Sequence, residues 1–323
     1  METPRTSLKG FRLEADLKDV PVAFVNALRR ILLAELPVVV LSTIQILENT
    51  SSMTHEMLKH RLEMLPVNVK PEETGVIRDT KLQLKIGAEG EPLEVTTNSF
   101  AVHGPRPDVL LKDRDLGTPL YFMRLAPGER ISIEASLAIA PAGASHVCVS
   151  TFRNTVDPEI AAMDKEAYVS QAGDDPKARA EAARLFDTFH IQRSFSRNKE
   201  TKRPDRFTLT IESIGVLEAK DLLRRACEVL KSKLEDWTKT PVLREGEGWV
   251  RMETEGETYT LGQLLQEVMY LGGLVDVVTR DLGHPLTPLL TIRFKAKTVQ
   301  PEAVIARCAA DAAALIENVL RSV

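Results

Sequence analysis

The chain has 323 residues, of which 43% are hydrophobic and 27% charged, so it can bury a substantial core in two or three compact units. Its formal net charge is −4, whereas a protein that grips duplex DNA with its own surface usually carries a basic excess. No apolar run approaches the roughly 20 residues that cross a bilayer, and METPRTSLKG lacks the apolar stretch of a secretory signal. We therefore expect a protein that stays inside a cell or particle and acts mainly through protein partners.

Residues 10–47 read as a strand, a helix and a second strand. Asp19 is a candidate helix cap, Pro21 falls in the first turn, and Pro37 ends the helix. Residues 38–47 are rich in β-branched side chains, which predicts a well-buried strand. One apolar stripe recurs at helical spacing and consists of Phe24, Leu28, Ile31 and Leu32.

Residues 203–237 combine an alternating strand with a long amphipathic helix. Residues 249–320 repeat the order strand, helix, strand and long helix, and Pro301 opens the last helix. The apolar stripe of the first long helix contains Leu223, Ala226, Cys227, Leu230 and Leu234. The stripes of the later helices contain Leu261, Leu264, Leu265, Val268 and Met269, followed by Val304, Cys308, Ala312, Leu315 and Val319.

The order of elements in the two halves of the chain predicts an internal duplication. Superposing their strands places Ile211 on Ile292 and Cys227 on Cys308, because both separations are 81 residues (292 − 211 and 308 − 227). Each half has apolar helical faces that it cannot cover alone, and quasi-two-fold packing would bury both, as in an isologous dimer. We predict an internal interface built from Leu223, Cys227, Leu230, Leu264, Leu265, Val304, Cys308 and Leu315.

An insertion from about Pro66 to Arg203 interrupts the first half and is far longer than an ordinary loop. Its strand-like stretches, separated by Gly and Pro turns, predict a small β-rich subdomain. Those stretches are residues 80–87, 92–104, 120–126 and 129–140, and the polar residues 164–206 read as helix plus loop. The predicted domains are 1–65 with 204–240, the insertion 66–203, and a second small domain at 241–323.

The run NALRRILLAELP at residues 26–37 resembles the signature helix of the alpha-like RNA polymerase subunits, meaning bacterial alpha, the archaeal D subunit and the third-largest subunit of the eukaryotic nuclear enzyme. Residues 55–66 are similar to the segment that follows in that family, with matches at His60, Arg61, Leu62 and Pro66.

Two further regions carry the resemblance. LAPGER at 125–130, followed by His146, resembles the insertion subdomain of the same family. TLGQLL at 260–265 and His284-Pro285-Leu286 are similar to the small partner subunit of the archaeal L or eukaryotic eleventh-subunit type. The fusion itself is similar to what large nucleocytoplasmic DNA viruses encode.

The resemblance implies an α+β fold in which two alpha-like dimerisation units pack as an intramolecular pseudo-dimer, with a β-rich insertion in the first. It also implies a non-catalytic platform, present once per complex, on which the largest and second-largest polymerase subunits and small assembly subunits gather, with DNA contacted only indirectly. A viral enzyme would work in the host cytoplasm, at a viral factory, and in the virion, with the nucleus as an alternative. No cofactor and no membrane are implied.

The residues that the resemblance assigns to partner binding are Asn26, Arg29, Arg30, Leu33, Glu35, His60 and Arg61. Arginines on the outside of an apolar helix suit bidentate pairing with carboxylates or carbonyls of a partner, and we expect Arg30 to contact the second-largest subunit. The plainer interpretation of two adjacent arginines is a solvated basic face.

No motif in the sequence predicts catalysis. His55-Glu56 and His60 superficially suggest a zinc-protease helix, but that site needs histidines four apart, and five apart separates them by about 140° around a helix. The family's insertion sometimes holds a cysteine-ligated zinc or iron–sulfur site, yet the insertion here contains only Cys148. Cys227 and Cys308 are interpreted as small core residues. We expect no metal site.

A basic cluster precedes the second strand block. It consists of Arg193, Arg197, Lys199, Lys202, Arg203 and Arg206. Such a cluster could touch nucleic acid or an acidic partner, although a solvated loop is the more common case.

Two other functions remain open from the sequence. One is a free-standing adaptor or chaperone that reuses the alpha-like fold outside a polymerase. The other is a homodimer like bacterial alpha with a DNA-reading C-terminal domain, which the repeated dimerisation pattern and the absence of a basic recognition helix disfavour.

Overall fold

The computed structural model describes residues 4–141, 146–198, 201–284, 286, 288–296 and 300–322. The chain divides into two compact units. Unit 1 comprises Met1–Ile31, Ser150–Ile211 and Leu223–Val323, and unit 2 comprises Leu32–Val149 and Glu212–Leu222. None of the described helices combines the length and the apolar composition needed to span a membrane.

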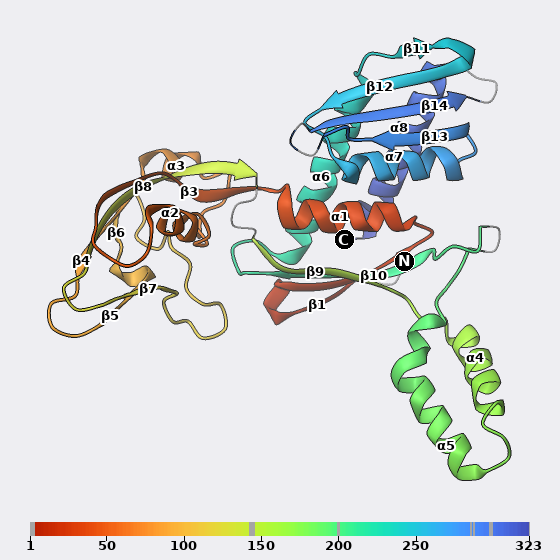
Figure 1. Ribbon diagram of the computed structural model, residues 1–323, viewed down its shortest axis with the longest axis horizontal. Coiled ribbons are helices and arrows are strands. Elements are labelled where there is room, and N and C mark those ends of the chain that lie inside the picture. The colour runs from red at the N-terminus through yellow and green to blue at the C-terminus, as the bar shows by residue number, and fades with distance from the viewer. Residues whose placement is uncertain are drawn as a thin grey trace. The chain divides into compact units, whose positions relative to one another are not determined.

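The first sheet of unit 1 has the strand order β1-β2-β10-β9 (Figure 1). Its strands are β1 (Arg5–Ser7), β2 (Arg12–Lys18), β9 (Val147–Asn154) and β10 (Arg206–Ser213). Leu13, Ala15 and Leu17 of β2 are buried and their neighbours are not, as expected for a strand with one face on a core. Thr208 donates to Asp16 Oδ1 at 2.7 Å and links β10 to β2 on their polar side.

Helix α1 (Val22–Ala34) follows this first strand pair, and its apolar stripe is buried as predicted. The predicted cap is wrong, because Pro21 occupies the position before the helix and its carbonyl accepts from the backbone N–H groups of Phe24 and Val25. Asp19 lies two residues earlier with φ of 57°, which turns the chain into the helix. Pro37 begins the next strand.

The second sheet of unit 1 has the order β11-β12-β14-β13. Its strands are β11 (Leu243–Glu245), β12 (Trp249–Glu255), β13 (Val275–Asp281) and β14 (Leu289–Ala296). β14 pairs antiparallel with both β12 and β13, and Met252 lies opposite Ile292. Helix α7 (Tyr259–Leu271) connects β12 to β13. The strand β13 was not predicted, because its alternation is interrupted by a bulge near Val275.

Two long helices complete the two halves of unit 1. α6 (Ala219–Thr238) follows β10, and α8 (Pro301–Ser322) follows β14. Both predicted stripes are buried, with one exception on α8. Leu315 is only half-buried, and its neighbour Ile316 takes the core position, because the buried positions Cys308, Ala312, Ile316 and Val319 follow a spacing of three and four residues.

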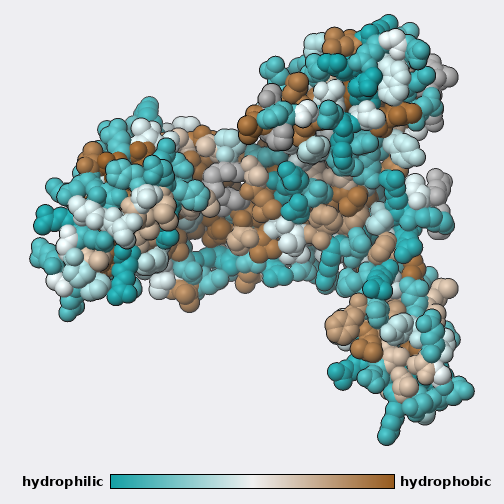
Figure 2. All heavy atoms as spheres, in the orientation of Figure 1, coloured by the Kyte–Doolittle hydropathy of each residue, from teal (hydrophilic) through white to brown (hydrophobic). Residues whose placement is uncertain are grey.

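Helices α4 (Pro158–Ser170) and α5 (Pro176–Leu185) form a hairpin (Figure 1). Each starts with proline after an aspartate whose side chain accepts from the first-turn backbone, Asp157 in α4 and Asp175 in α5. Figure 2 shows hydrophobic residues among hydrophilic ones on this hairpin, and Met163 and Phe189 are among the most exposed apolar side chains described.

Unit 2 contains a sheet of order β3-β8-β4-β6 and a two-stranded sheet β5-β7. The strands are β3 (Pro37–Asn49), β4 (Lys81–Gly87), β5 (Leu93–Thr96), β6 (Ala101–His103), β7 (Tyr121–Leu125) and β8 (Arg130–Pro141). Helices α2 (His55–Glu63) and α3 (Thr74–Asp79) complete it. A core containing Leu58, Leu84 and Ile133 joins these elements, and Phe100 meets Phe122 edge to face at 5.6 Å. The stretches predicted as strands between residues 80 and 140 do form strands, whereas the insertion as a separate subdomain stays a prediction.

Two strands cross the predicted domain boundaries. β3 was assigned to the first dimerisation domain, yet it pairs along its length with β8. Only Val38–Leu41 are buried, and the rest of β3 alternates because one face of its sheet is open to solvent. β9 falls inside the predicted insertion but neighbours β10 in the first sheet. The boundaries themselves stay a prediction.

Candidate functional site

The signature-like helix α1 carries its polar side chains on one side. Arg29 Nε donates to Asn26 Oδ1 at 3.0 Å, a contact three residues apart that fixes the arginine along its own helix. Arg30 is exposed, whereas Asn26 and Arg29 are half-buried. Arg30 Nε donates to Thr260 Oγ1 of α7 at 2.7 Å. This bond uses one of five N–H groups, so the terminal nitrogens of the exposed guanidinium can still donate to a partner.

A second hydrogen bond joins α1 to α7 at the other end. The backbone N–H of Ala23, in the first turn of α1, donates to Glu267 Oε2 at 3.1 Å. The contacts run from the start of α1 to the end of α7 and from the end of α1 to the start of α7, so the two helices lie antiparallel. Figure 1 shows them next to each other. A carboxylate at a helix N-terminus satisfies an orphan N–H and complements the helix dipole.

Glu267 is the polar residue of this site that the sequence analysis missed. Its side chain is 7% exposed, and Oε1 accepts from Arg203 Nη1 at 3.3 Å. The signal was present, because residues 264, 267, 268 and 271 share one face of α7 and Glu267 places a charge among two leucines and a valine. A buried carboxylate needs hydrogen-bond partners, and here it has both a helix N-terminus and an arginine.

The glycine of the TLGQLL run has a packing role. A methyl group on Gly262 would lie 2.6 Å from Leu290 Cδ1, so the absence of a side chain lets α7 approach β14 closely.

Thr258 caps α7 with its side chain, which accepts from Thr260 N. Nearby, Lys233 of α6 pairs with Glu257 at 2.9 Å. His284 and Leu286 of the second similar segment are described, and Pro285 lies outside the described residues.

In unit 2, the segment after the signature helix forms α2. Arg61 Nε donates to the Phe122 carbonyl at 3.0 Å and ties α2 to β7 within the unit, whereas His60 is exposed. The LAPGER run makes the tight turn from β7 to β8, where Gly128 has φ of 83° and Ala126 N donates to Glu129 Oε2 at 2.7 Å. Leu33 and Glu35, at the end of α1 and beyond it, are half-buried. Partner roles for these residues stay a prediction.

The residues predicted for the internal interface are buried, apart from Leu315. Burial raises the pKa of the Cys227 thiol to about 12 and that of Cys308 to about 12, which fits small core residues and not reactive thiols. Cys308 lies against α7, with Sγ 3.9 Å from the Leu265 carbonyl oxygen. Across the described part of the chain, no group of three His, Cys, Asp or Glu residues is placed to hold a metal ion.

The basic cluster is dispersed by the fold. Arg203 pairs with Glu267, Arg206 pairs with Asp16 at 3.5 Å, and Arg197 stacks over the Phe195 ring at 4.6 Å. Arg193 and Lys202 are exposed, and Lys199 lies outside the described residues. Two of the cluster's charges are therefore engaged within unit 1, and contact with nucleic acid stays a prediction.

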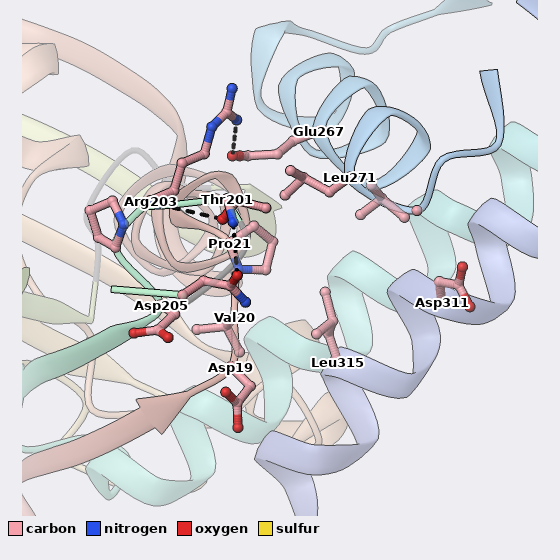
Figure 3. Close-up of a pocket in the computed structure, with 14 residues that line it drawn as sticks. Asp19, Val20, Pro21, Thr201, Arg203, Asp205, Glu267, Leu271, Asp311 and Leu315 are labelled. Carbon is pink, nitrogen blue, oxygen red and sulfur yellow. Dashed lines mark hydrogen bonds and ion pairs between the residues drawn. The ribbon is translucent and has the colours of Figure 1, made fainter. Parts of the chain in front are cut away.

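A pocket of about 350 Å³ lies beside the start of α1 (Figure 3). It is bordered by the α1 entry, the segment before β10, the end of α7 and α8. Its lining includes Asp19, Val20, Pro21, Arg203, Asp205, Glu267, Leu271, Asp311 and Leu315. The Glu267 carboxylate that holds the α1 N-terminus therefore also lines this pocket.

Comparison with known proteins shows the family to which the signature helix and most of the chain belong. The sequence profile of the RNA polymerase Rpb3/Rpb11 dimerisation domain matches residues 14–234, about two thirds of the chain. The chain belongs to this family. The matched residues run from β2 through α1, the whole β-rich region and most of α6.

Relatives of this Rpb3/Rpb11 family member include polymerase subunits. The DNA-directed RNA polymerase subunit Rpo3 of Pyrobaculum calidifontis is 25% identical over 252 residues, covering 70% of this chain and 91% of the relative. The DNA-directed RNA polymerases I and III subunit rpac1 of Dictyostelium discoideum is 26% identical, covering 67% and 74%. A conjugation stage-specific protein of Tetrahymena thermophila is 28% identical, covering 71% and 91%. The predicted alpha-like family is thus confirmed.

Proposed function

We propose that this chain is a non-catalytic assembly subunit of DNA-dependent RNA polymerase, on which the largest and second-largest subunits associate. The observation that carries the proposal is α1, the family's signature helix, which presents the exposed Arg30 beside a fixed neighbouring helix. A guanidinium held at Nε is positioned in advance, so less side-chain entropy is lost when its remaining donors meet a partner carboxylate. The names of the archaeal and Dictyostelium relatives support a role in the same enzyme.

We further infer that residues 241–323 act as the small dimerisation partner of the first half. Arg30 and Glu267 are each the ninth residue of a 13-residue helix, and each bonds to the second residue of the other helix, Thr260 or Ala23. Reciprocal contacts between equivalent positions are what a two-fold interface produces. One chain would then supply both members of the dimer and enter each complex as a single copy.

We also infer a viral origin, because a fusion of two such dimerisation units is similar to fusions in large nucleocytoplasmic DNA viruses. Transcription would then take place in the cytoplasm or the virion. DNA would be contacted only through the complex, because the chain's net charge of −4 disfavours binding to phosphates.

The test is co-purification of the two large subunits through a tag on the full-length chain. We expect Arg30→Ala to lower their recovery by at least about tenfold, as for an interface hot-spot arginine. Thr260→Val is the matched control, because it removes the bond between α1 and α7 but keeps Arg30 and its charge. Arg321→Ala, at a highly exposed arginine of α8, controls for loss of charge.

The outcomes separate three explanations. Loss of the large subunits in Arg30→Ala alone supports direct contact. Equal loss in Thr260→Val assigns the effect to the internal bond, and full recovery in all variants overturns the role of Arg30. Recovery of the wild-type chain without either large subunit overturns the polymerase function and favours a free-standing adaptor. The mass of the purified chain supplies an independent check, since internal pairing predicts a 35.9 kDa monomer.

A further inference from the structure

The pocket beside the start of α1 has an apolar floor that is only partly covered. Val20 and Val268 are buried, but Leu271 is 39% exposed and Leu315 is half-buried. In Figure 3, Leu271 of α7 and Leu315 of α8 point toward the same space, with Pro21 on its other side. An aliphatic side chain placed there would remove both leucines from water, which is the main favourable term in association.

The rim of this pocket is acidic. Among the lining residues that the structure describes, Asp19, Asp205, Glu267 and Asp311 are acidic and Arg203 alone is basic. Arg203 is already paired with Glu267, and Asp311 accepts from Arg307 at 2.9 Å. Asp19 is exposed, and it has no ion pair within the part of the chain that the structure describes. Negative charge in excess around an apolar floor repels phosphates and acidic segments and attracts a cationic one.

The surface continues past the pocket. A second pocket, of about 490 Å³, shares Arg203 and Glu267 with the first and is lined by Tyr270 and Val277. Tyr270 is 57% exposed, and exposed tyrosine is enriched at protein interfaces. The Arg203–Glu267 pair thus lines both pockets, which suits an extended segment that places successive side chains about 7 Å apart on one side.

We propose that this pocket binds an extended segment of another polymerase subunit, in which an aliphatic side chain is flanked by a lysine or arginine. This rests on the proposed function, because the segment comes from the same assembly. The aliphatic side chain enters between Leu271 and Leu315, and the acidic rim attracts the flanking cation. The site is separate from the Arg30 contact and adds a second attachment for a neighbouring subunit.

The experiment is site-specific photo-crosslinking in the assembly purified through a tag on the full-length chain. The photoreactive p-benzoylphenylalanine replaces Leu271, and in a control chain it replaces Leu116, which is 76% exposed in unit 2. Because both leucines are exposed, neither replacement should disturb the fold, and the thermal unfolding midpoint verifies this. We expect position 271 to crosslink to a peptide of another subunit that has Lys or Arg within a few residues of an aliphatic side chain.

The charge part of the proposal has its own test. The double variant Asp19→Asn with Asp311→Asn neutralises the rim, and Asn tolerates the left-handed φ of position 19. We expect the crosslink at position 271 to fall by about fivefold, the effect of losing two surface ion pairs. The proposal is overturned by a yield no greater than at position 116, or by a crosslink to nucleic acid, to a second copy of this chain or to a segment without a basic residue.

Failure of the proposed docking site can be distinguished from failure of the proposed polymerase function. If the large subunits co-purify and position 271 gives no crosslink above the control, only the docking site is wrong. If no large subunit co-purifies with the wild-type chain, the polymerase role is wrong and with it the origin of the segment.

Discussion

Helices α1 and α7 occupy matching places in the two halves of the chain but obtain their N-terminal hydrogen bonds differently. α7 is preceded by Thr258, whose side chain accepts from its own first turn. α1 is preceded by Pro21, which has no side-chain oxygen, and the N–H of Ala23 is satisfied by Glu267 of α7. The ninth residue of each helix reaches across to the other, yet one is an arginine and the other a glutamate.

The difference shows that the dependence between the halves is unequal. A carboxylate is favourable at a helix N-terminus, whereas the Arg30 cation at the start of α7 is not, and it bonds a hydroxyl instead. Removing α7 would leave a buried backbone N–H of α1 without its acceptor. Removing α1 would leave α7 with its own cap. The half that carries the family's signature helix therefore relies on the C-terminal half for local helix stability.

The largest expected effect concerns the apolar positions that the two helices share. Leu28 and Leu265 are both the seventh residue of their helix and both fully buried. We expect Leu28→Ala and Leu265→Ala each to lower the free energy of unfolding by about 2–5 kcal/mol, measured by denaturant unfolding of the full-length chain. Leu116→Ala, at an exposed position, should stay within about 0.5 kcal/mol. A loss as small as the control's at either helix would contradict their equivalence.

Removal of the Glu267 carboxylate should have the next largest effect. Glu267→Ala leaves the buried N–H of Ala23 unpaired and frees Arg203, so we expect a loss of about 1–3 kcal/mol in unfolding free energy. Glu267→Gln keeps an acceptor of the same shape and should lose about half as much. If both variants unfold at the wild-type denaturant midpoint, the carboxylate does not stabilise α1 and the unequal dependence is wrong.

The sequence predicted the elements with strong periodicity and the family, but not every contact between them. The stripes of α1, α6 and α7 follow helical spacing, and each is buried as expected. Asp19 was predicted as a helix cap from its residue type and its distance to the helix. That prediction is wrong because Asp19 has a left-handed φ of 57°, which a sequence does not reveal. Glu267 was overlooked because its partner, the N-terminus of α1, lies 244 residues away.

Strand pairing across long sequence separations was not predicted from the sequence. β3 looks like a strand of its neighbouring helix unit, but its pairing partner is β8. β9 was not predicted as a strand, because its second half is polar apart from Phe152, and its sheet is evident only from its place beside β10. Hydrophobic alternation predicts a strand and indicates which of its residues share a face, but it does not predict which strand pairs with it.

Alkaline pH should distinguish the two buried cysteines from the exposed one. The pKa of Cys227 and that of Cys308 are each raised by burial from 9.0 to about 12. Because the folded pKa lies above the unfolded one, the thiols' contribution to stability is complete below pH 9 and is lost as the pH rises toward 12.

The measurement is unfolding free energy in reductant between pH 9 and pH 11.5. Above pH 9 the unfolding free energy should decrease as the pH rises. We expect Cys227→Ala and Cys308→Ala each to reduce the slope of this decrease by up to about 1.4 kcal/mol per pH unit, the value for one proton. Cys148→Ala, at an exposed cysteine, should change the slope less. A different slope change at positions 227 and 308 would show that the long helices α6 and α8 bury their cysteines unequally.

The smallest expected effect is at the other end of the α1–α7 contact. Thr260→Val removes the hydroxyl that accepts from Arg30, but Arg30 is exposed and can donate to water instead, so we expect a loss of only about 0.5 kcal/mol in unfolding free energy. Ala23 has no such alternative, because its N–H is buried. The two variants therefore measure the asymmetry directly, and a loss in Thr260→Val that equals the loss in Glu267→Ala would show that the halves depend on each other equally.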